Sequence, residues 1–212
     1  MSVATQVPVI DLFAGPGGLG EGFSAARVRG QGPFRIAPAI EKDPDAHATL
    51  RLRSFFRQFA LDTPHSALRN RRKAAMCKAQ AASQGFAGRH VPETYYQHLR
   101  GELTRDELYA RHPVEAERAA QQAWHAELGG ATAPSDLVRR RIRQALAGAD
   151  AWVLIGGPPC QAYSIAGRSR NRGVTGYRLE RDERHHLYGE YLAIVADLWP
   201  PVFVVETVQG NR

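Results

Sequence analysis

Cysteine is scarce in this sequence of 212 residues, and long apolar runs are missing. The two cysteines, Cys77 and Cys160, are too few for the disulfide framework of a small secreted domain, and they suit a reducing compartment. No apolar stretch approaches the roughly 18 residues that a membrane-spanning helix needs. The short polar start, residues 1–7, does not have the pattern of a secretory signal. These absences predict a cytoplasmic protein with no membrane partner.

Two well-known glycine signatures are also missing. The glycine-rich stretch at residues 14–20 lacks the G-x-G-x-x-G spacing of dinucleotide-binding folds, and no Gly-Lys-Ser/Thr closes it as in a P-loop. The chain nevertheless has 43% hydrophobic residues and enough length for a sizeable core. Its net charge of +7 favours a polyanionic partner.

The chain begins with the pattern of a strand, a glycine turn and a helix. Residues 7–13 are typical of a strand, residues 14–20 form the turn, and residues 21–26 resemble a helix start. This order opens a nucleotide-binding βαβ unit, whereas the alternative is a turn that serves only chain reversal. A second predicted strand, residues 34–40, ends at Glu41, where such units place the acid that binds ribose hydroxyls. An ordinary solvent-facing glutamate is the alternative for Glu41.

A stiff turn follows another short apolar stretch later in the chain. Residues 152–155 predict a buried strand that is too short for a helix, and two glycines and two prolines then end it. Cys160 comes next, at the carboxyl end of the strand, where reacting groups gather in open α/β sheets. This position predicts a nucleophile, whereas a small buried hydrophobe is the alternative.

The segment after Cys160 is polar and dense in arginine. Guanidinium groups bind phosphates well, so this segment predicts a lid over nucleic acid, with an exposed loop as the alternative. The helix-like residues 187–198 then lead to a predicted buried strand, residues 200–205, which ends at Glu206. Two neighbouring strands would therefore direct a thiol and a carboxyl group into one cleft.

The middle of the chain, residues 49–149, is rich in Arg, Ala, Gln and Leu, which favours helices. Residues 104–107 have the pattern of a capping box, and another helix is predicted to begin near Ser135. We therefore expect a helical insertion between a first part of the catalytic domain, residues 1–48, and a second part, residues 150–212.

Four segments resemble, in order, the motifs of the DNA cytosine-5 methyltransferases. They are Asp11-Leu12-Phe13-Ala14-Gly15-Pro16-Gly17-Gly18, Pro158-Pro159-Cys160-Gln161, Asp182-Glu183-Arg184-His185-His186-Leu187-Tyr188 and Val204-Val205-Glu206-Thr207-Val208. The resemblance implies the α/β class and the Rossmann-like S-adenosylmethionine-dependent methyltransferase fold. We expect an incomplete, doubly wound and mostly parallel sheet with a largely helical insertion.

The resemblance also implies S-adenosyl-L-methionine as the cofactor. By position, Phe13 would lie against its adenine, and Glu41 would bind the ribose hydroxyls. Lys42 stands where the family usually has an apolar or aromatic adenine contact, and Glu127 is the candidate for the acidic contact to the adenine amino group. The remaining implied contacts are Gly15, Gly17 and Gly18 for the methionine part, and Pro158 and Leu187 on the other side of the pocket.

The activity that the resemblance implies is methyl transfer to carbon 5 of cytosine in double-stranded DNA. The Cys160 thiolate would add to carbon 6, and Glu206 would stabilise the charge on the ring through nitrogen 3. Thr207 replaces the Asn that the family usually has after this glutamate. No metal is expected. The implied DNA-contacting residues are Gln161, Ser164 and Arg168.

The family's later arginine motif, target-recognition domain and C-terminal helix have no counterpart before Arg212. We therefore expect the isolated chain to be inactive or nearly so. Three alternatives stay open: a half-enzyme completed by a second chain that supplies target recognition, a tRNA cytosine-5 methyltransferase, and an inactive DNA-binding remnant. By resemblance, the biological setting would be restriction-modification.

Overall fold

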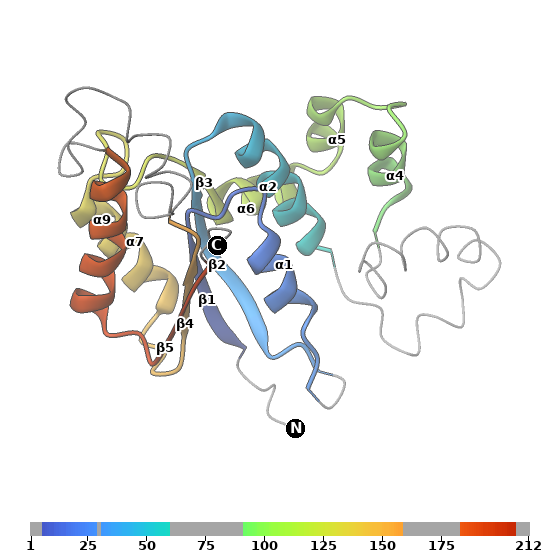
Figure 1. Cartoon of the computed structure of the whole chain (residues 1–212). Helices are drawn as coiled ribbons and strands as arrows, with labels where there is room; N and C mark the ends of the chain where they lie inside the picture. Colours follow the sequence, from blue (N-terminus) through green and yellow to red (C-terminus); the bar gives the residue numbers. More distant parts are fainter. Residues whose placement is uncertain (1–5, 29–30, 60–90, 159–182, 207–212) are drawn as a thin grey trace, which may run out of the picture. The chain divides into compact units, whose positions relative to one another are not determined.

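The computed structural model describes residues 6–28, 31–59, 91–158 and 183–206 (Figure 1). The chain forms two compact units, the first from Met1–Leu50 with Gln122–Arg212 and the second from Arg51–Gln121. The second unit is shorter than the insertion expected at residues 49–149. The difference arises because residues 123–149 contribute a strand and a helix to the first unit.

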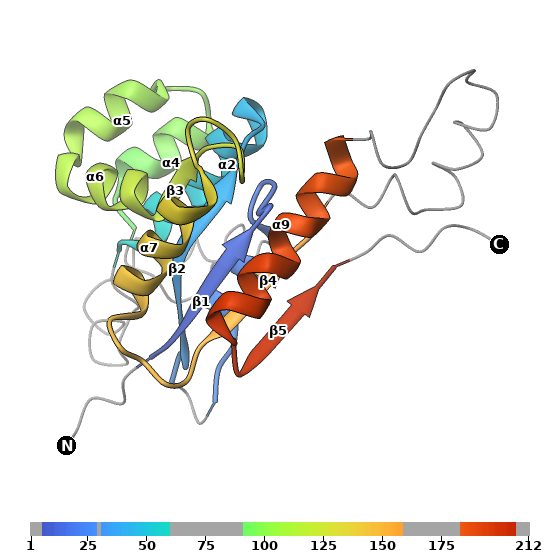
Figure 2. The ribbon, with the colours of Figure 1, turned by 90° about the vertical axis from the view of Figure 1, so that its left-hand side faces the viewer.

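The described part of the first unit contains a five-stranded sheet in the order β3-β2-β1-β4-β5, and all neighbouring strands are parallel (Figure 2). The strands are β1 (Val7–Leu12), β2 (Phe34–Glu41), β3 (Ala123–His125), β4 (Val153–Gly156) and β5 (Val202–Val205). The strand order reverses between β1 and β4. In open α/β sheets, ligands bind at such a switch point, beyond the carboxyl ends of the strands.

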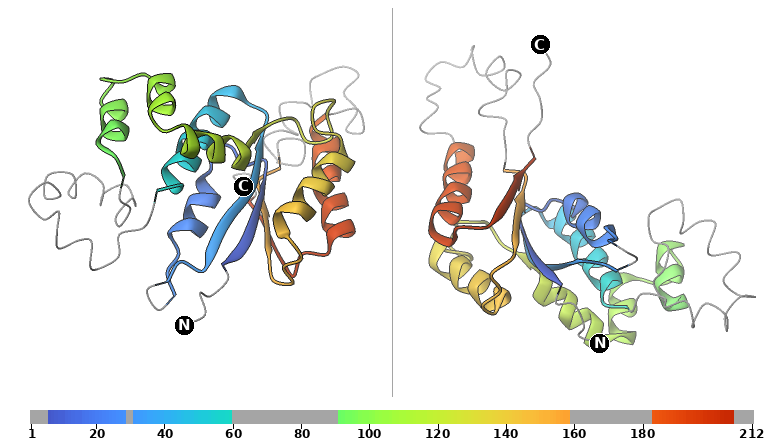
Figure 3. Two further views of the ribbon diagram at one scale, coloured as in Figure 1. Left: turned by 180° about the vertical axis from the view of Figure 1, so that it is seen from behind. Right: turned by 90° about the horizontal axis from the view of Figure 1, so that it is seen from below.

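Helices α7 (Ser135–Leu146) and α9 (Glu183–Leu198) cover one face of this sheet (Figure 3). The buried residues of α7 recur every fourth position, which is the spacing of an amphipathic helix. They are Val138, Ile142 and Leu146. They share a core with Leu12 of β1, Leu154 of β4 and Tyr191 of α9, of which each is fully buried. The burial of these apolar side chains fixes α7 and α9 on the sheet.

The opposite face packs against α1 (Gly18–Ala25) and the beginning of α2 (Pro44–Arg57). Val9 of β1 and Ile155 of β4 are fully buried there, beside Leu50 of α2. Phe23 of α1 meets Phe34 edge to face, with ring centroids 5.0 Å apart. The sheet therefore has helices on both faces, which confirms the predicted α/β class and its doubly wound, parallel sheet.

Strand β5 differs from the other strands because its side chains are exposed. Val202, Phe203 and Val204 are 51%, 53% and 37% exposed. The prediction of a buried strand over residues 200–205 is therefore wrong for the described part of the chain. Within that part, β5 pairs only with β4 and lies at the edge of the sheet (Figure 2). An apolar run is typical of a parallel strand that is covered on both faces, so the pattern alone did not indicate an edge position.

The second unit contains α4 (Glu93–Leu99), α5 (Arg105–Arg111) and most of α6 (Pro113–Gln122). Its core contains Phe55, Phe56, Tyr95 and Leu108. The capping box predicted at residues 104–107 is confirmed, because Thr104 Oγ1 accepts the Glu107 N–H and the Glu107 carboxylate accepts the Thr104 N–H.

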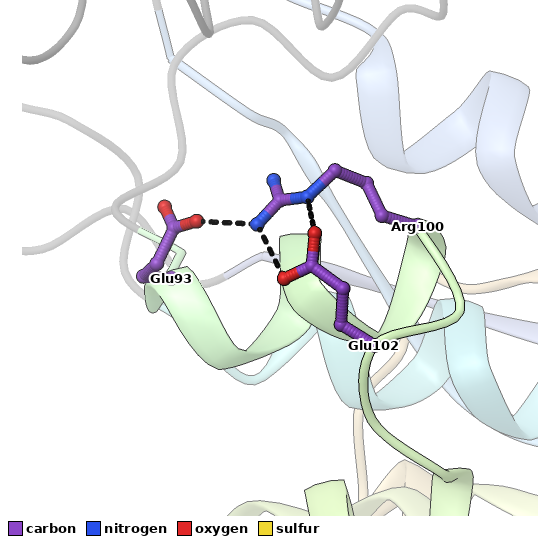
Figure 4. A network of polar contacts seen from close by, with 3 residues as sticks. All are labelled: Glu93, Arg100 and Glu102. Carbon is purple, nitrogen blue, oxygen red and sulfur yellow. Dashed lines mark hydrogen bonds and ion pairs between the residues drawn. The ribbon is translucent and has the colours of Figure 1, made fainter.

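An exposed polar network links α4 to the turn that follows it. Arg100 lies between Glu93 and Glu102 and donates a hydrogen bond of 2.9 Å to the Glu93 carboxylate (Figure 4). The hydrogen bond from Arg100 also lowers the pKa of Glu102.

No described helix has the length and the apolar character needed to cross a membrane.

Candidate functional site

Four of the predicted site residues lie at the carboxyl ends of four strands. Phe13 follows β1, Glu41 ends β2, Pro158 lies just beyond β4, and Glu206 follows β5. Parallel strands bring these ends to one edge of the sheet. The predicted residues Cys160, Gln161, Ser164 and Arg168 lie outside the described residues, as does Thr207.

The glycine turn after β1 has an unusual backbone. Phe13, Gly15 and Gly17 have φ angles of 58°, 55° and 90°, which lie in the left-handed region. Glycine adopts this region at little cost, whereas a side chain such as that of Phe13 is strained there by about 1–3 kcal/mol. The Ala14 N–H bonds to the Ile40 carbonyl at 2.9 Å, and the Phe13 ring packs against the core. The fold therefore holds a conformation that the sequence did not indicate.

The space above this turn is open. A Cβ atom added at Gly15 or at Gly18 would meet no atom within 4 Å. Gly18 is also the first residue of α1, whose early N–H groups have no partner within the helix. A ligand can therefore approach the backbone closely at this turn.

Glu41 braces the turn from the end of β2. Its Oε2 accepts the Gly15 N–H at 2.8 Å, and its Oε1 accepts the Asp43 N–H at 2.7 Å. Each carboxylate oxygen has two acceptor sites, so these bonds leave Glu41 with the capacity to accept hydroxyl groups. Glu41, which is predicted to bind the ribose, thus also has a structural role, because it connects the glycine turn to the end of β2.

The end of β4 packs so closely that only glycine fits. A Cβ atom at Gly156 would lie 2.4 Å from the Leu12 carbonyl oxygen and 2.9 Å from the Tyr191 ring. The Gly156 carbonyl accepts the Glu206 N–H at 2.9 Å, and a Cβ atom at Gly157 would lie 3.9 Å from Glu206 Oε2. The backbone of Glu206 is therefore held beside the end of β4, and its carboxylate lies near Gly157, three residues before Cys160.

The two predicted residues on the other side of the pocket are both buried. Leu187 of α9 is 5% exposed, and Pro158 is buried beyond the end of β4. Tyr191, one turn after Leu187, directs its hydroxyl to the Val204 carbonyl at 3.4 Å. Burial, helped by the charge of Asp11, raises the pKa of the Tyr191 phenol. Helix α9 is thus connected to both β4 and β5.

One hollow joins the glycine turn to the carboxylate of β5. Its volume is about 440 Å³, and it is largely apolar. The lining residues are Gly18, Leu19, Gly22, Phe23, Ala26, Phe34 and Glu206. Residues that the sequence assigns to cofactor binding and to catalysis therefore line the same space.

A second hollow, of about 490 Å³, lies at the carboxyl ends of β2 and β3. Lys42 and Glu127 form an ion pair at its wall, with Nζ and Oε1 3.0 Å apart. Sequence reasoning named Glu127 but missed β3 and His125, which lines the same hollow. Strand β3 has only three residues and follows α6 without a break, so neither a turn signal nor an apolar pattern marks it. Among the described residues, no group of three or more His, Cys, Asp or Glu is placed to hold a metal ion.

Comparisons with known proteins agree with this geometry. A model of the family described as C-5 cytosine-specific DNA methylase matches residues 107–211. The chain is 30% identical over 217 residues to the type II methyltransferase M.Bpa9945I of Bacillus paralicheniformis, a match that covers 95% of this chain and 40% of that protein. The chain thus spans about 40% of the length of this relative.

Shorter matches involve two archaeal proteins. The chain is 42% identical over 65 residues to the DNA (cytosine-5-)-methyltransferase M.ApeKI of Aeropyrum pernix, which covers 31% of this chain and 13% of that protein. It is 47% identical over 60 residues to the putative type II methyltransferase M.MjaORF1200P of Methanocaldococcus jannaschii, which covers 28% of this chain and 16% of that protein. The motifs, the parallel sheet and these matches agree, and they make the chain similar to the C-5 cytosine-specific DNA methylase family.

Proposed function

We propose that the protein carrying this chain transfers a methyl group from S-adenosyl-L-methionine to carbon 5 of cytosine in double-stranded DNA. The hollow shared by Gly18 and Glu206 carries this proposal, because it brings the glycine turn and the carboxylate together beside the turn that leads to Cys160. The match to M.ApeKI, whose name gives this activity, supports the same reaction.

The described residues fit the cofactor. The open space above Gly15 and Gly18 gives a ligand access to the backbone, and the left-handed Gly17 completes the turn. Glu41 has the acceptor capacity for the ribose hydroxyls, and Phe13 offers an aromatic ring for the adenine. When bound, the cofactor supplies an electrophilic methyl group. We assign the opposite side of its pocket to Pro158 and Leu187, and the adenine amino group to Glu127.

Cys160 and Glu206 share the chemistry on the base. Carbon 5 of cytosine is a poor nucleophile until the Cys160 thiolate adds to carbon 6 and makes the ring enamine-like. Glu206 stabilises the charge on the ring through nitrogen 3. After methylation, loss of the proton from carbon 5 lets the ring expel Cys160 as a thiolate. An unperturbed thiol with a pKa of about 8.5 is mostly protonated at neutral pH, so the site must favour the thiolate.

The base must leave the DNA helix before Cys160 can reach it, at a cost of a few kcal/mol. We propose that Gln161, Ser164 and Arg168 contact the DNA around the extruded base. Phosphate contacts of this kind position a duplex without reading its sequence. A second chain that supplies target recognition is part of this proposal, and its co-purification with the present chain would support it.

Covalent trapping tests the function. The full protein is incubated with S-adenosylmethionine and duplex DNA that contains 5-fluorocytosine, because fluorine prevents the final elimination and leaves the adduct in place. We expect an adduct that survives denaturing electrophoresis, its loss in Cys160→Ser, and its retention in the matched control Cys77→Ser.

Two other outcomes would replace the proposal. An adduct with tRNA in place of duplex DNA would indicate an RNA methyltransferase. DNA affinity that is equal in wild type and Cys160→Ser, with no adduct in either protein, would indicate a DNA-binding remnant.

A further inference from the structure

The Lys42–Glu127 ion pair forms part of the wall of the hollow at the ends of β2 and β3. Lys42 immediately follows Glu41, and Glu127 lies two residues beyond the end of β3. The two side chains are 52% and 49% exposed. An ion pair with this exposure contributes only about 0–1 kcal/mol to the free energy of folding. Stabilisation of the fold is therefore a weak explanation for the presence of this pair.

The backbone at Lys42 is fixed by two stacked histidines. The ring of His125 donates from Nε2 to the Lys42 carbonyl at 3.0 Å. His125 stacks on His47, with ring centroids 4.6 Å apart, and His47 Nε2 donates to the Ala123 carbonyl at 3.1 Å. Because both acceptors are carbonyls, both Nε2 atoms carry a proton. Lys42 is thus joined to β3 through its main chain and to the loop after β3 through its side chain.

The loop that carries Glu127 is also held in place. The Glu127 carbonyl accepts the Gly130 N–H at 2.9 Å. Gly129, with φ at 76°, leaves no room for a side chain, because a Cβ atom there would lie 2.9 Å from the Glu190 carboxyl carbon. Glu190 in turn accepts a hydrogen bond of 2.7 Å from Ser135 Oγ. Helices α7 and α9 therefore support the second half of the ion pair.

The pair leaves acceptor capacity on Glu127. Lys42 Nζ binds Oε1, whereas an ionised carboxylate has two oxygens and about four acceptor sites. Lys42 can donate hydrogen bonds but cannot accept them. A fixed carboxylate beside the ribose-binding Glu41 suits a purine that carries an amino group, and it repels one that presents a carbonyl oxygen there.

We propose that Lys42 is a positioning residue that holds Glu127 toward the 6-amino group of the cofactor's adenine, so that the ion pair makes the site selective for adenine over a 6-oxo purine. In this chain, Lys42 would thus contribute through the carboxylate rather than as an apolar or aromatic surface. The inference rests on the proposed function, because it places the nucleoside end of S-adenosylmethionine in this hollow.

The test compares the binding of two ligands by calorimetry: S-adenosylhomocysteine and its deaminated form, in which the adenine is replaced by hypoxanthine. Wild type should prefer the adenine form by roughly tenfold, as expected when a mismatched ligand leaves a polar group unpaired. Lys42→Met keeps the apolar stem but removes the charge, and it should reduce this preference several-fold. Glu127→Gln should abolish the preference, because an amide can face either purine.

Lys42→Arg retains the positive charge and should restore the preference, and the Lys42→Met/Glu127→Gln double variant should be no worse than Glu127→Gln alone. An unchanged preference in Lys42→Met, with both ligands bound, would overturn the inference and leave the proposed function standing. If the wild-type protein bound neither ligand, the cofactor assignment itself would fall, and this inference with it. Unfolding curves of the variants should match wild type, since the pair is exposed.

Discussion

The two sides of the sheet, here called its flanks, differ in how deeply their strands are buried. On the flank of β1 and β2, Val9, Ile10 and Ala39 are fully buried, and Glu41 braces the glycine turn by two hydrogen bonds. On the other flank, β4 is buried, but Val202 and Phe203 of β5 are more than half exposed. The framework of the proposed cofactor site is thus packed within the described chain, whereas Glu206, the proposed catalytic carboxylate, follows an exposed edge strand.

Strands β4 and β5 thus differ in burial, although the same apolar sequence pattern predicts both. Apolar runs form both β4 and β5, yet within the described residues only β4 of these two has a strand on each side and helices over its faces. If this comparison is correct, the free energy of unfolding should depend strongly on the β4 end of the site and weakly on β5. Point substitutions can test that gradient.

The largest effect is expected for Gly156→Ala. The new methyl group would lie 2.4 Å from the Leu12 carbonyl oxygen, which belongs to the backbone of β1 and cannot move aside cheaply. We expect a loss of about 3 kcal/mol or more in the free energy of unfolding, measured by urea denaturation. Gly157→Ala is the matched control, because its methyl group would find its nearest atom at 3.8 Å. Equal losses in the two variants would contradict the close packing of β4 against β1.

The next effect compares truncations to alanine at two residues that are register partners on neighbouring strands. Ile155→Ala removes a fully buried side chain from β4 and should cost about 2–5 kcal/mol. Val204→Ala removes a side chain that is 37% exposed from the strand beside it, and it should cost less than about 1 kcal/mol. The measurement is the shift of the urea midpoint at constant slope. A large loss in Val204→Ala would show that β5 is covered in solution, and it would remove the contrast between the flanks.

Much of this architecture could be predicted from the sequence. The capping box at Thr104 and Glu107, the start of α7 at Ser135 and the strand that ends at Glu41 all depend on local signals and lie where we expected them, and β4 lies within one residue of its predicted range. Local chemistry controls these features, because a cap or a helical face requires only neighbours in sequence. The order of the motifs was enough to indicate the family.

The remaining features depend on contacts between distant residues. Strand β3 exists because Ala123, Trp124 and His125 pair with β2, and nothing within three residues reveals that partner. The left-handed backbone at Phe13 is held by the bond from Ala14 to Ile40 and by core packing. The exposure of β5 depends on which strands lie next to it, which an apolar run does not indicate.

Glu41→Gln tests the first flank at its polar end. The substituted amide keeps one acceptor oxygen but places an NH₂ group against the N–H of either Gly15 or Asp43, so one brace is lost. We expect a loss of about 1–2 kcal/mol in the free energy of unfolding. Faster amide hydrogen exchange should appear in the glycine turn. Asp150→Asn, at an exposed position, is the control and should stay within about 0.5 kcal/mol of wild type. Unchanged exchange in the turn would show that Glu41 does not brace it.

The smallest effect at neutral pH is expected for Tyr191→Phe, which cuts the hydrogen bond from α9 to the Val204 carbonyl. That bond is long, at 3.4 Å, so the expected loss is about 0.5–1 kcal/mol at pH 7. The substitution should also change how the free energy of unfolding depends on pH in the alkaline range. Because burial raises the pKa of Tyr191 in the folded state, the unfolded chain ionises first, near its usual pKa of about 10. The stabilisation is therefore complete below about pH 10 and is lost as the pH rises toward the folded pKa.

Phenylalanine cannot ionise, so wild type should lose its advantage over Tyr191→Phe, and then fall below it, as the pH rises above about 10. Urea denaturation of both proteins at pH 7, 9 and 10.5 measures this difference. Tyr109, whose pKa burial also raises, is present in both proteins, so the difference between the curves isolates Tyr191. Parallel curves would mean that the phenol is accessible to solvent in the folded state. Helix α9 would then hold β5 less firmly than the burial of Tyr191 indicates. Neither face of the edge strand β5 would be tightly packed.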